Sequence, residues 1–227
     1  MPYLFLDARY ERVRLEVRIV DCAVLIAVGI DATGKRRVVG CTVATNEAEI
    51  NWRRFLESLL ARGLHGVKLI VADDHAGLKA ARRAVLPAVP WQRCQFHLQQ
   101  NAGQFVTRQE ARKTVATQLR TIFNAPDKME AERLLRSALE AWREEHPKLA
   151  EWAEVAVPES LTVFDFPAAH RVRLRTTRPY THQPGTATTH PLPASSPTPI
   201  PACVWSRPFL PNSTTSETYK VYLNLNP

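Results

Sequence analysis

Proline divides this chain of 227 residues into two unlike parts. Ten of the 17 prolines lie in residues 178–227, which are also rich in Thr and Ser and contain Glu217 as their only acidic residue. Proline fixes φ and has no N–H to donate, so a run such as Pro197-Thr198-Pro199-Ile200-Pro201 cannot continue a helix or a central strand. We therefore expect residues 178–227 to form a disordered Pro/Thr-rich tail. Residues 1–177, in contrast, carry the periodic patterns of a folded domain.

The composition narrows the class of protein. An apolar fraction of 45% is enough for a globular core. No stretch reaches the roughly 18 apolar residues of a membrane-spanning helix, and the first residues lack the pattern of a signal peptide. Four scattered cysteines predict a reduced, cytoplasmic protein without a disulfide framework. The net charge of +8 favours an anionic partner, nucleic acid before any other.

Apolar patterns predict a mixed α/β sheet in the first half of the chain. We expect strands over residues 3–7, 15–20, 24–30 and 37–43, the later ones joined in an antiparallel meander. A helix should follow, with Asn46 as its N-cap, Glu49 three residues later and Gly63 at its end. A strand at 67–72, a helix at 77–85 and a strand at 91–96 follow. This order of strands and helices implies a mixed α/β sheet.

The stretch from His97 to Glu154 has a helical pattern throughout. Its apolar residues recur at spacings of three and four, as in Val115, Leu119 and Phe123. Asp127 is the expected N-cap of a later helix in this stretch, with Glu130 three residues on.

Two acidic residues follow predicted strands. Asp7 comes after Tyr3-Leu4-Phe5-Leu6, and Asp73 comes after Leu69-Ile70-Val71-Ala72. If these strands are neighbours, the carboxylates converge, and a divalent cation would relieve their repulsion. Magnesium held in this way can activate water or a 3′-hydroxyl for an in-line displacement at phosphorus. The spacing alone leaves open that each aspartate is a turn or cap residue.

Two further groups of residues are candidates for function. Cys94 and His97 form a C-x-x-H pair, which supplies two of the four ligands of a zinc site, so we favour a packing or hydrogen-bonding role. We expect His97 to approach the phosphate site from the end of its strand. The alternating residues Arg171, Arg173 and Arg175 could neutralise DNA phosphates, although a solvated face explains them equally well.

Three motifs together resemble one family. They are Tyr3-Leu4-Phe5-Leu6-Asp7-Ala8-Arg9-Tyr10, Val71-Ala72-Asp73-Asp74-His75-Ala76-Gly77-Leu78 and Trp91-Gln92-Arg93-Cys94-Gln95-Phe96-His97-Leu98-Gln99-Gln100-Asn101. In this order they are similar to the Mutator-type transposases of bacterial insertion sequences. The resemblance covers about residues 1–177, and the order of the three motifs makes it specific.

The resemblance implies an RNase H-like core with an Asp-Asp-Glu triad, two Mg²⁺ ions and an all-α insertion before the Glu. Asp7 and Asp73 match the first two carboxylates and metal ligands, and Asp74 is the less favoured choice for the second. The motif residues Asp74, His75, Cys94 and His97 would lie near the site. The implied domains are the first part of the core at 1–96, the insertion at 97–160 and the return to the core at 161–177.

The sequence departs from the family in two places. It begins almost at the first catalytic strand, where the family has a long N-terminal region for end recognition and assembly. After Thr177 it lacks the segment whose Glu is the third metal ligand, yet residues 220–227 again resemble the family's C-terminus. We therefore expect a chain truncated at its N-terminus and frameshifted near residue 177, with an out-of-frame tail over 178–227.

The predicted function is that of a transposase fragment acting on DNA. Its partners would be the terminal inverted repeats of an insertion sequence and target DNA, with no membrane partner, and a homo-oligomer is compatible with the sequence. Because the third carboxylate is missing, we expect the chain to be inactive or nearly so. The alternatives are a non-catalytic DNA-binding remnant, or another RNase H-like nuclease that completes its site with Glu110 or Asp165.

Overall fold

The computed structural model describes residues 1–15 and 18–177, so the predicted tail at 178–227 lies outside the described residues. Five strands form one sheet in the order β3-β2-β1-β4-β5. They are β1 (Tyr3–Leu15), β2 (Arg18–Ile30), β3 (Arg36–Ala44), β4 (Leu69–Ala72) and β5 (Trp91–Arg93). β2 is antiparallel to both of its neighbours, β1 and β3. On the other side of β1, β4 runs parallel to β1, and β5 runs parallel to β4. The prediction of a mixed sheet is confirmed.

The antiparallel part is longer than its apolar pattern predicts. The strands expected at 15–20 and 24–30 are one continuous strand, β2, and β1 continues past Asp7 to Leu15. The charged residues in this extension do not end the strand because they lie at the exposed end of the hairpin and can reach water or each other. Arg9 and Glu11, for example, form an exposed ion pair at 2.6 Å.

Two helices precede β5, α1 (Glu49–Ala61) and α2 (Ala76–Val85). The prediction that Asn46 caps α1 is wrong, because Ala48 occupies the N-cap position. The Asn46 side chain instead accepts a hydrogen bond from the Ala48 N–H at 3.0 Å, which shapes the loop before the helix. Gly63 follows α1 with φ of +91°, a left-handed conformation that glycine adopts without strain.

The remaining described chain is helical. Its helices are α3 (Gln95–Ala102), α4 (Gln109–Phe123), α5 (Lys128–Glu145), α6 (Pro147–Ala156) and α7 (Ala168–Leu174), joined in part by the 3₁₀ turns η1 (Gly103–Phe105), η2 (Pro158–Ser160) and η3 (Thr162–Asp165). Asp127 caps α5 as predicted, accepting a hydrogen bond from the Glu130 N–H at 2.8 Å. The strand predicted at 91–96 ends at Arg93, so His97 lies in the first turn of α3 and not at a strand end.

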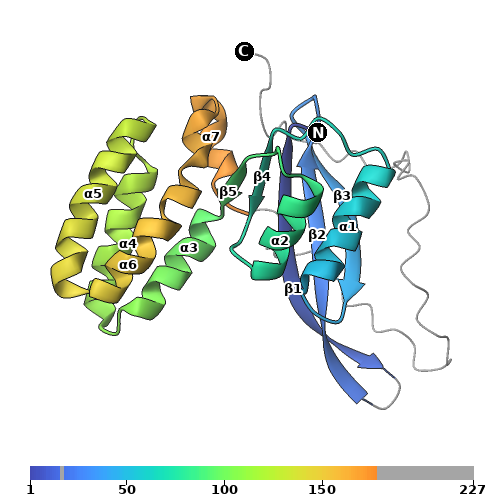
Figure 1. Cartoon of the computed structure of the whole chain (residues 1–227), viewed down its shortest axis with the longest axis horizontal. Coiled ribbons are helices and arrows are strands. Elements are labelled where there is room, and N and C mark those ends of the chain that lie inside the picture. The colour runs from blue at the N-terminus through green and yellow to red at the C-terminus, as the bar shows by residue number, and fades with distance from the viewer. Residues whose placement is uncertain (16–17, 178–227) are drawn as a thin grey trace, which may run out of the picture.

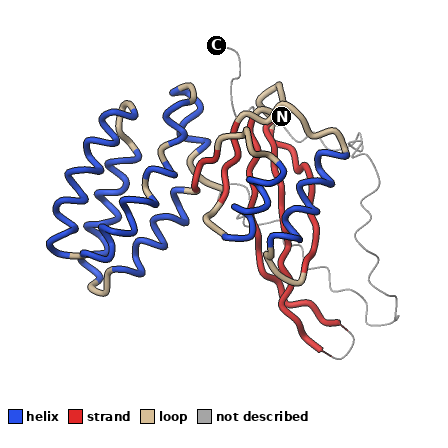
Figure 2. The backbone as a smooth tube through the Cα atoms, viewed as in Figure 1, coloured by secondary structure: helices blue, strands red, loops and turns tan. Residues whose placement is uncertain are grey.

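Different helices cover the two faces of the sheet. Leu4, Leu6 and Ile70 point into a core with α1 and α2. Tyr3, Phe5 and Val71, whose side chains alternate with these, point into a second core with α3 to α7. Figures 1 and 2 show the helical group α3 to α6 beside the β5 end of the sheet. None of the helices in the described part of the chain is long and apolar enough to cross a bilayer.

Candidate functional site

The strand register brings together Asp7, which lies within β1, and Asp73, which directly follows β4, at the carboxyl end of β4; this place is called the sheet edge below. β1 and β4 are paired in parallel, with Phe5 opposite Val71, and β4 ends at Ala72, so Asp73 follows β4 beside the part of β1 that carries Asp7. Phe5 points into the core covered by α3 to α7, and the alternation of β1 carries Asp7 onto this same face. Asp73 lies 3.8 Å from His97 of α3, and the charges of Asp73 and Asp7 both act on His97. Two carboxylates that lie far apart in sequence are therefore neighbours.

Local hydrogen bonds orient both carboxylates. Oδ1 of Asp7 accepts a hydrogen bond from the Ala8 N–H at 3.1 Å, and Oδ1 of Asp73 accepts one from the Asp74 N–H at 2.7 Å. The other oxygen of Asp73, Oδ2, lies 3.8 Å from Nδ1 of His97. The first turn of α3 thus presents an imidazole ring to the pair of aspartates.

Cys94 holds the end of the described chain against this site. It is fully buried at the N-cap of α3, where its S–H donates to Oγ1 of Thr176 at 3.4 Å. Sγ of Cys94 also accepts a hydrogen bond from the N–H of Thr177 at 3.4 Å, and Thr177 is itself fully buried. The backbone after α7 therefore returns to the start of α3, beside His97. The structure gives Cys94 the hydrogen-bonding position that the sequence favoured.

Cys94 and His97 alter each other's pKa. Burial raises the pKa of the Cys94 thiol, but hydrogen bonding with His97, the charge of His97 and the hydrogen bond with Thr176 outweigh burial and lower it to about 7. Hydrogen bonding with Cys94 raises the pKa of His97. Burial opposes this rise, but the negative charges of Cys94, Asp73 and Asp7 bring the pKa to about 9. At neutral pH, His97 therefore carries a positive charge next to the aspartates.

Glu47 is a third acid near the site, and the sequence pattern did not single it out. Its side chain is 14% exposed, and Oε2 lies 3.8 Å from Nδ1 of His75. Burial raises the pKa of Glu47, the charge of His75 lowers it, and the negative charges of Asp7 and Asp73 raise it again. Glu47 lies in the loop before α1, so no strand-end signal in the sequence marks it.

Gly77 explains how the loop of Glu47 reaches this edge. A Cβ atom at Gly77 would meet the backbone oxygen of Glu47 and approach the backbone nitrogen of Glu49 to 2.9 Å. The first turn of α2 thus lies directly against the loop, at a distance that only glycine allows. The glycine of the Asp-Asp-His-Ala-Gly segment therefore has a packing role.

Asp74 takes part in a network of ion pairs with Lys79 and Arg93. Its carboxylate lies 2.7 Å from Nζ of Lys79 and 2.8 Å from Nη1 of Arg93. Glu159 pairs with the same two cations, at 2.9 Å and 3.2 Å. Because Arg93 is 3% exposed, this network is a structural tie between the sheet, α2 and η2. Its engagement in the network favours Asp73 over Asp74 as a ligand for a cation.

The donor set at the sheet edge fits part of a magnesium site. Carboxylates are the hard oxygen ligands that Mg²⁺ accepts, and Asp7 and Asp73 supply two of them. Within residues 1–15 and 18–177, no group of three or more His, Cys, Asp or Glu side chains is arranged to hold a metal ion. A complete site would therefore need another ligand.

The three arginines predicted to contact DNA lie on or next to α7. Arg171 donates to the backbone oxygens of Phe164, Phe166 and Pro126 at 3.0–3.1 Å. Arg175 is half-buried and donates to Oδ1 of Asn124 at 2.6 Å, and burial lowers its pKa. These two guanidinium groups thus have structural partners. Arg173 is more exposed than either of them.

The two acids considered for an alternative nuclease site lie in the helical region. Glu110 forms an exposed ion pair with Lys113 at 3.0 Å, and Asp165 forms one with Lys128 at 3.0 Å. Neither is among the charges that shift the pKa of His97 or Glu47. The structure therefore gives no support to a site completed by Glu110 or Asp165.

Comparison with known proteins identifies the family of this chain. The model of the Mutator family of transposases matches residues 1–181. The chain is 84% identical over 176 residues to the transposase for insertion sequence element IS406 of Burkholderia multivorans, a match that covers 78% of this chain and 45% of the relative. It is 41% identical over 175 residues to the transposase for insertion sequence element ISRM5 of Rhizobium meliloti, covering 77% of this chain and 44% of that one. The chain thus spans less than half the length of these relatives. It belongs to the Mutator family of transposases.

Proposed function

We propose that this chain derives from an insertion-sequence transposase, an enzyme that would cleave and join DNA phosphodiesters with the help of Mg²⁺. The observation that carries the proposal is the meeting of Asp7 and Asp73 on one face of the sheet, in a chain of the Mutator family. The strand order, with β1 between an antiparallel and a parallel neighbour, supports an RNase H-like core. On this proposal the core occupies residues 1–96 and 161–177, and the all-α insertion occupies 97–160.

The residues at the sheet edge would have different roles in the reaction. Asp7 and Asp73 would hold Mg²⁺, which when bound supplies an activated hydroxyl and neutralises charge on the phosphate. His97, protonated at neutral pH, would add a positive charge where the anionic strand approaches Asp73. Cys94 would position His97 by fixing the first turn of α3 against Thr176 and Thr177.

The chain itself should be catalytically inactive. Residues 178–227 contain only one acid, Glu217, and it lies among Pro, Ser and Thr. A catalytic metal must be held to within about half an ångström, so a missing third carboxylate should lower the rate by orders of magnitude. We attribute the loss to a frameshift near residue 177. Translation of the encoding DNA in the other frames should give a Leu-Glu-Arg-Leu-Asn-like segment, and its absence from every frame would refute the frameshift.

A chimera tests the function separately from the missing segment. In the Burkholderia multivorans relative, the 176 matched residues are replaced by those of this chain, and Mg²⁺-dependent strand transfer is measured on DNA with that element's ends. We expect activity within about tenfold of the relative. Asp7→Asn or Asp73→Asn in the chimera should lower it by about 1,000-fold or more, the scale of losing transition-state stabilisation.

Two controls make this experiment decisive. Glu110→Gln removes an exposed acid in the first turn of α4 that pairs with Lys113, and it should leave the activity of the chimera unchanged. The unaltered chain of 227 residues should give no strand-transfer product. The proposal fails if the chimera keeps its activity after Asp7→Asn or Asp73→Asn.

A further inference from the structure

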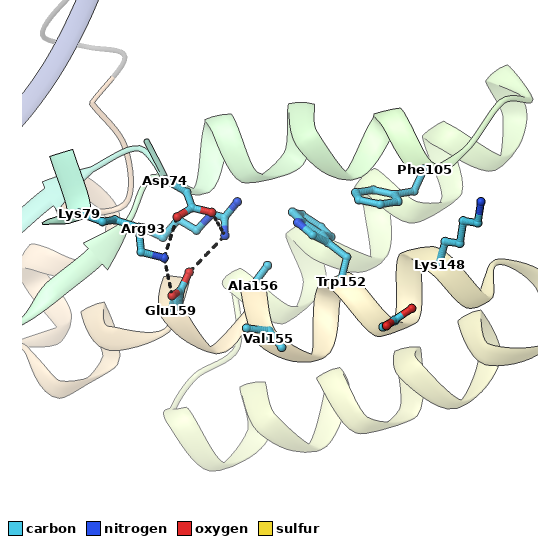
Figure 3. Close-up of a pocket in the computed structure, with 10 residues that line it drawn as sticks. Asp74, Lys79, Arg93, Phe105, Lys148, Trp152, Val155, Ala156 and Glu159 are labelled. Atoms are coloured by element: carbon cyan, nitrogen blue, oxygen red, sulfur yellow. Dashed lines mark hydrogen bonds and ion pairs between the residues drawn. The ribbon is translucent and has the colours of Figure 1, made fainter. Parts of the chain in front are cut away.

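A cavity of about 600 Å³ lies between the sheet and the helical region (Figure 3). Its walls come from the end of β4, from α2, β5, η1, α6 and η2. The cavity adjoins the sheet edge, but none of the roles proposed there for Asp7, Asp73 or His97 uses it. Its chemistry therefore calls for a separate explanation.

Flat side chains form one wall of the cavity. The rings of Phe105 and Trp152 are stacked, with centroids 5.1 Å apart and planes 29° apart. The guanidinium group of Arg93 lies 5.4 Å from the centre of the Trp152 ring. Phe105 is 37% exposed and Val155, on the same cavity, is 70% exposed. A flat ligand that covered these apolar groups would remove them from water, which is favourable.

The charges around the cavity are balanced. Asp74 and Glu159 neutralise Lys79 and Arg93 through the four ion pairs drawn in Figure 3. The cavity lining adds one further cation and one further acid, Lys148 and Glu151. A phosphate group here would meet as many negative charges as positive ones. A neutral ligand that has both hydrogen-bond donors and acceptors fits better, and a nucleobase is flat and has both.

The cavity begins one residue away from the candidate metal site. Asp73 and Asp74 are consecutive, so their Cα atoms are about 3.8 Å apart. Asp73 faces His97, whereas Asp74 faces Arg93 in the cavity wall. A DNA strand whose phosphate lay between Asp7 and Asp73 would therefore have its adjoining nucleotide beside the cavity.

We propose that this cavity binds a single nucleobase turned out of the DNA helix next to the phosphate that reacts, stacked on the wall of Phe105 and Trp152. The inference rests on the proposed function, because the position of the phosphate comes from Asp7 and Asp73. A base that is still paired is stacked within the duplex and cannot lay its face on this wall, and turning it out costs free energy. The cost is smallest for a base without a partner, so the cavity should give a preference for unpaired bases.

The test uses the full chain and three fluorescently labelled duplexes of one sequence, compared by anisotropy at one salt concentration. The first duplex is fully paired. In the second, one thymine lies opposite an abasic site and so has no partner. In the third, both strands are abasic at that position, so no base is present there. We expect the second to bind about tenfold more tightly than the other two, the scale of stacking one base on an aromatic platform. Phe105→Ala and Trp152→Leu should remove most of this preference but leave binding to the paired duplex, which depends on phosphates.

Controls separate a failure of this inference from a failure of the proposed function. Met129→Ala removes an exposed apolar side chain on α5, away from the cavity, and should keep the preference. Trp152 packs against the core, so if Trp152→Leu lowers the melting temperature, the more exposed Phe105→Ala decides the matter.

Several outcomes would overturn the inference. If the doubly abasic duplex binds as tightly as the one with the unpaired thymine, the chain selects bendable DNA and not a base. A preference that survives Phe105→Ala would likewise overturn it. Salt-dependent binding that is equal for all three duplexes would overturn the nucleobase site and leave the proposed function standing. Absence of DNA binding altogether would count against the proposed function as well.

Discussion

The two faces of the sheet are built from different parts of the sequence. On one face, Leu4 and Leu6 pack with α1 and α2, and the core is complete by Trp91. On the other, Tyr3 and Phe5 pack with helices that continue as far as Leu174. Asp7 and Asp73 lie on the second face, and the helices that cover this face, α3 to α7, come later in the chain than all the other helices and strands. Both acids thus come from the first half of the chain, whereas the completion of the site depends on the return of the segment around Thr177, which contacts Cys94.

The candidate site nevertheless takes residues from both sides of the sheet. Glu47 reaches the acids through the contact of its loop with Gly77, which belongs to the α1 and α2 side. His97 and Thr177 come from the side of the helical region. Changes on either side should therefore affect the same folded unit, and the size of each effect should follow the burial of the group that is changed.

The largest effect is expected from truncating a fully buried ring on each side. Trp52 is fully buried in the core with α1 and α2, and Trp142 is 2% exposed in the core with α3 to α7. Trp52→Ala and Trp142→Ala should each lower the free energy of unfolding by about 4 kcal/mol, through lost burial and the cavity left behind. Urea unfolding followed by circular dichroism measures this. Because the two cores share β1 and β4, each variant should unfold in a single transition, and two separate transitions would show that the faces fold independently.

A smaller effect is expected where α2 meets the loop of Glu47. Gly77→Ala should lower the free energy of unfolding by about 3 kcal/mol, because the new Cβ meets backbone atoms that cannot move without shifting the loop. Gly103→Ala is the matched control, since it has a helical φ of −62° and nothing within 4 Å of its Cβ position. Thermal unfolding of both variants compares them. Equal stabilities would mean that the loop is not held against α2.

The ion pairs of Asp74 should contribute less than the buried rings. Asp74→Asn should lower the free energy of unfolding by about 2 kcal/mol, because it weakens the pairing of the buried Arg93, which keeps Glu159 as a partner. Asp165→Asn removes an exposed pair with Lys128 and should change stability by less than about 1 kcal/mol. Urea unfolding of both proteins gives the comparison, and a cost for Asp165→Asn equal to that for Asp74→Asn would contradict it.

The smallest effect is expected at the β2–β3 turn, far from the site. Oδ1 of Asp31 accepts hydrogen bonds from the Thr33 hydroxyl at 2.6 Å and from the N–H groups of Thr33 and Lys35 at 2.9 Å and 3.0 Å, and Oδ2 accepts one from Arg37. Burial raises the pKa of Asp31, but these hydrogen bonds outweigh it and lower the pKa from 3.8 to about 2. Asp31→Asn should therefore lower the free energy of unfolding by about 1 kcal/mol at pH 7.

The pH dependence at Asp31 has a definite sign. Because the folded-state pKa is the lower one, its stabilising effect is present above pH 3.8 and is lost as the pH falls toward 2. The stability difference between the native chain and Asp31→Asn should thus be smaller at pH 3 than at pH 7. Thermal unfolding at the two pH values tests this, and a difference that grows on acidification would contradict it.

Much of the scaffold could be predicted because it depends on local patterns. The apolar runs before Asp7 and Asp73 are strands, and Asp127 with Glu130 marks the start of α5, since these signals depend only on neighbouring residues. The failures have equally local causes. The charged residues after Asp7 do not fit an apolar strand pattern, so this pattern does not predict the extension of β1 to Leu15. Cys94 and Phe96 fit the alternation of a strand, although they lie at the start of α3.

The rest of the site could not be predicted because it depends on contacts between distant segments. Nothing near Glu47 in the sequence shows that Gly77 admits its loop to the sheet edge. The ion pairs of Asp74 with Arg93, and of Arg93 with Glu159, likewise join segments that only the folded chain brings together. The same is true of the contact between Cys94 and Thr177.

The sharing of one divalent cation by Asp7 and Asp73 is most directly tested with manganese. Crystals of the full chain would be soaked in Mn²⁺, an anomalous scatterer that substitutes for Mg²⁺ in oxygen sites, and examined by anomalous diffraction. We expect a peak between the two carboxylates, within about 2.3 Å of an oxygen of each, that disappears in Asp73→Asn. A peak that persists in Asp73→Asn, or no peak between the aspartates at saturating Mn²⁺, would contradict the shared cation.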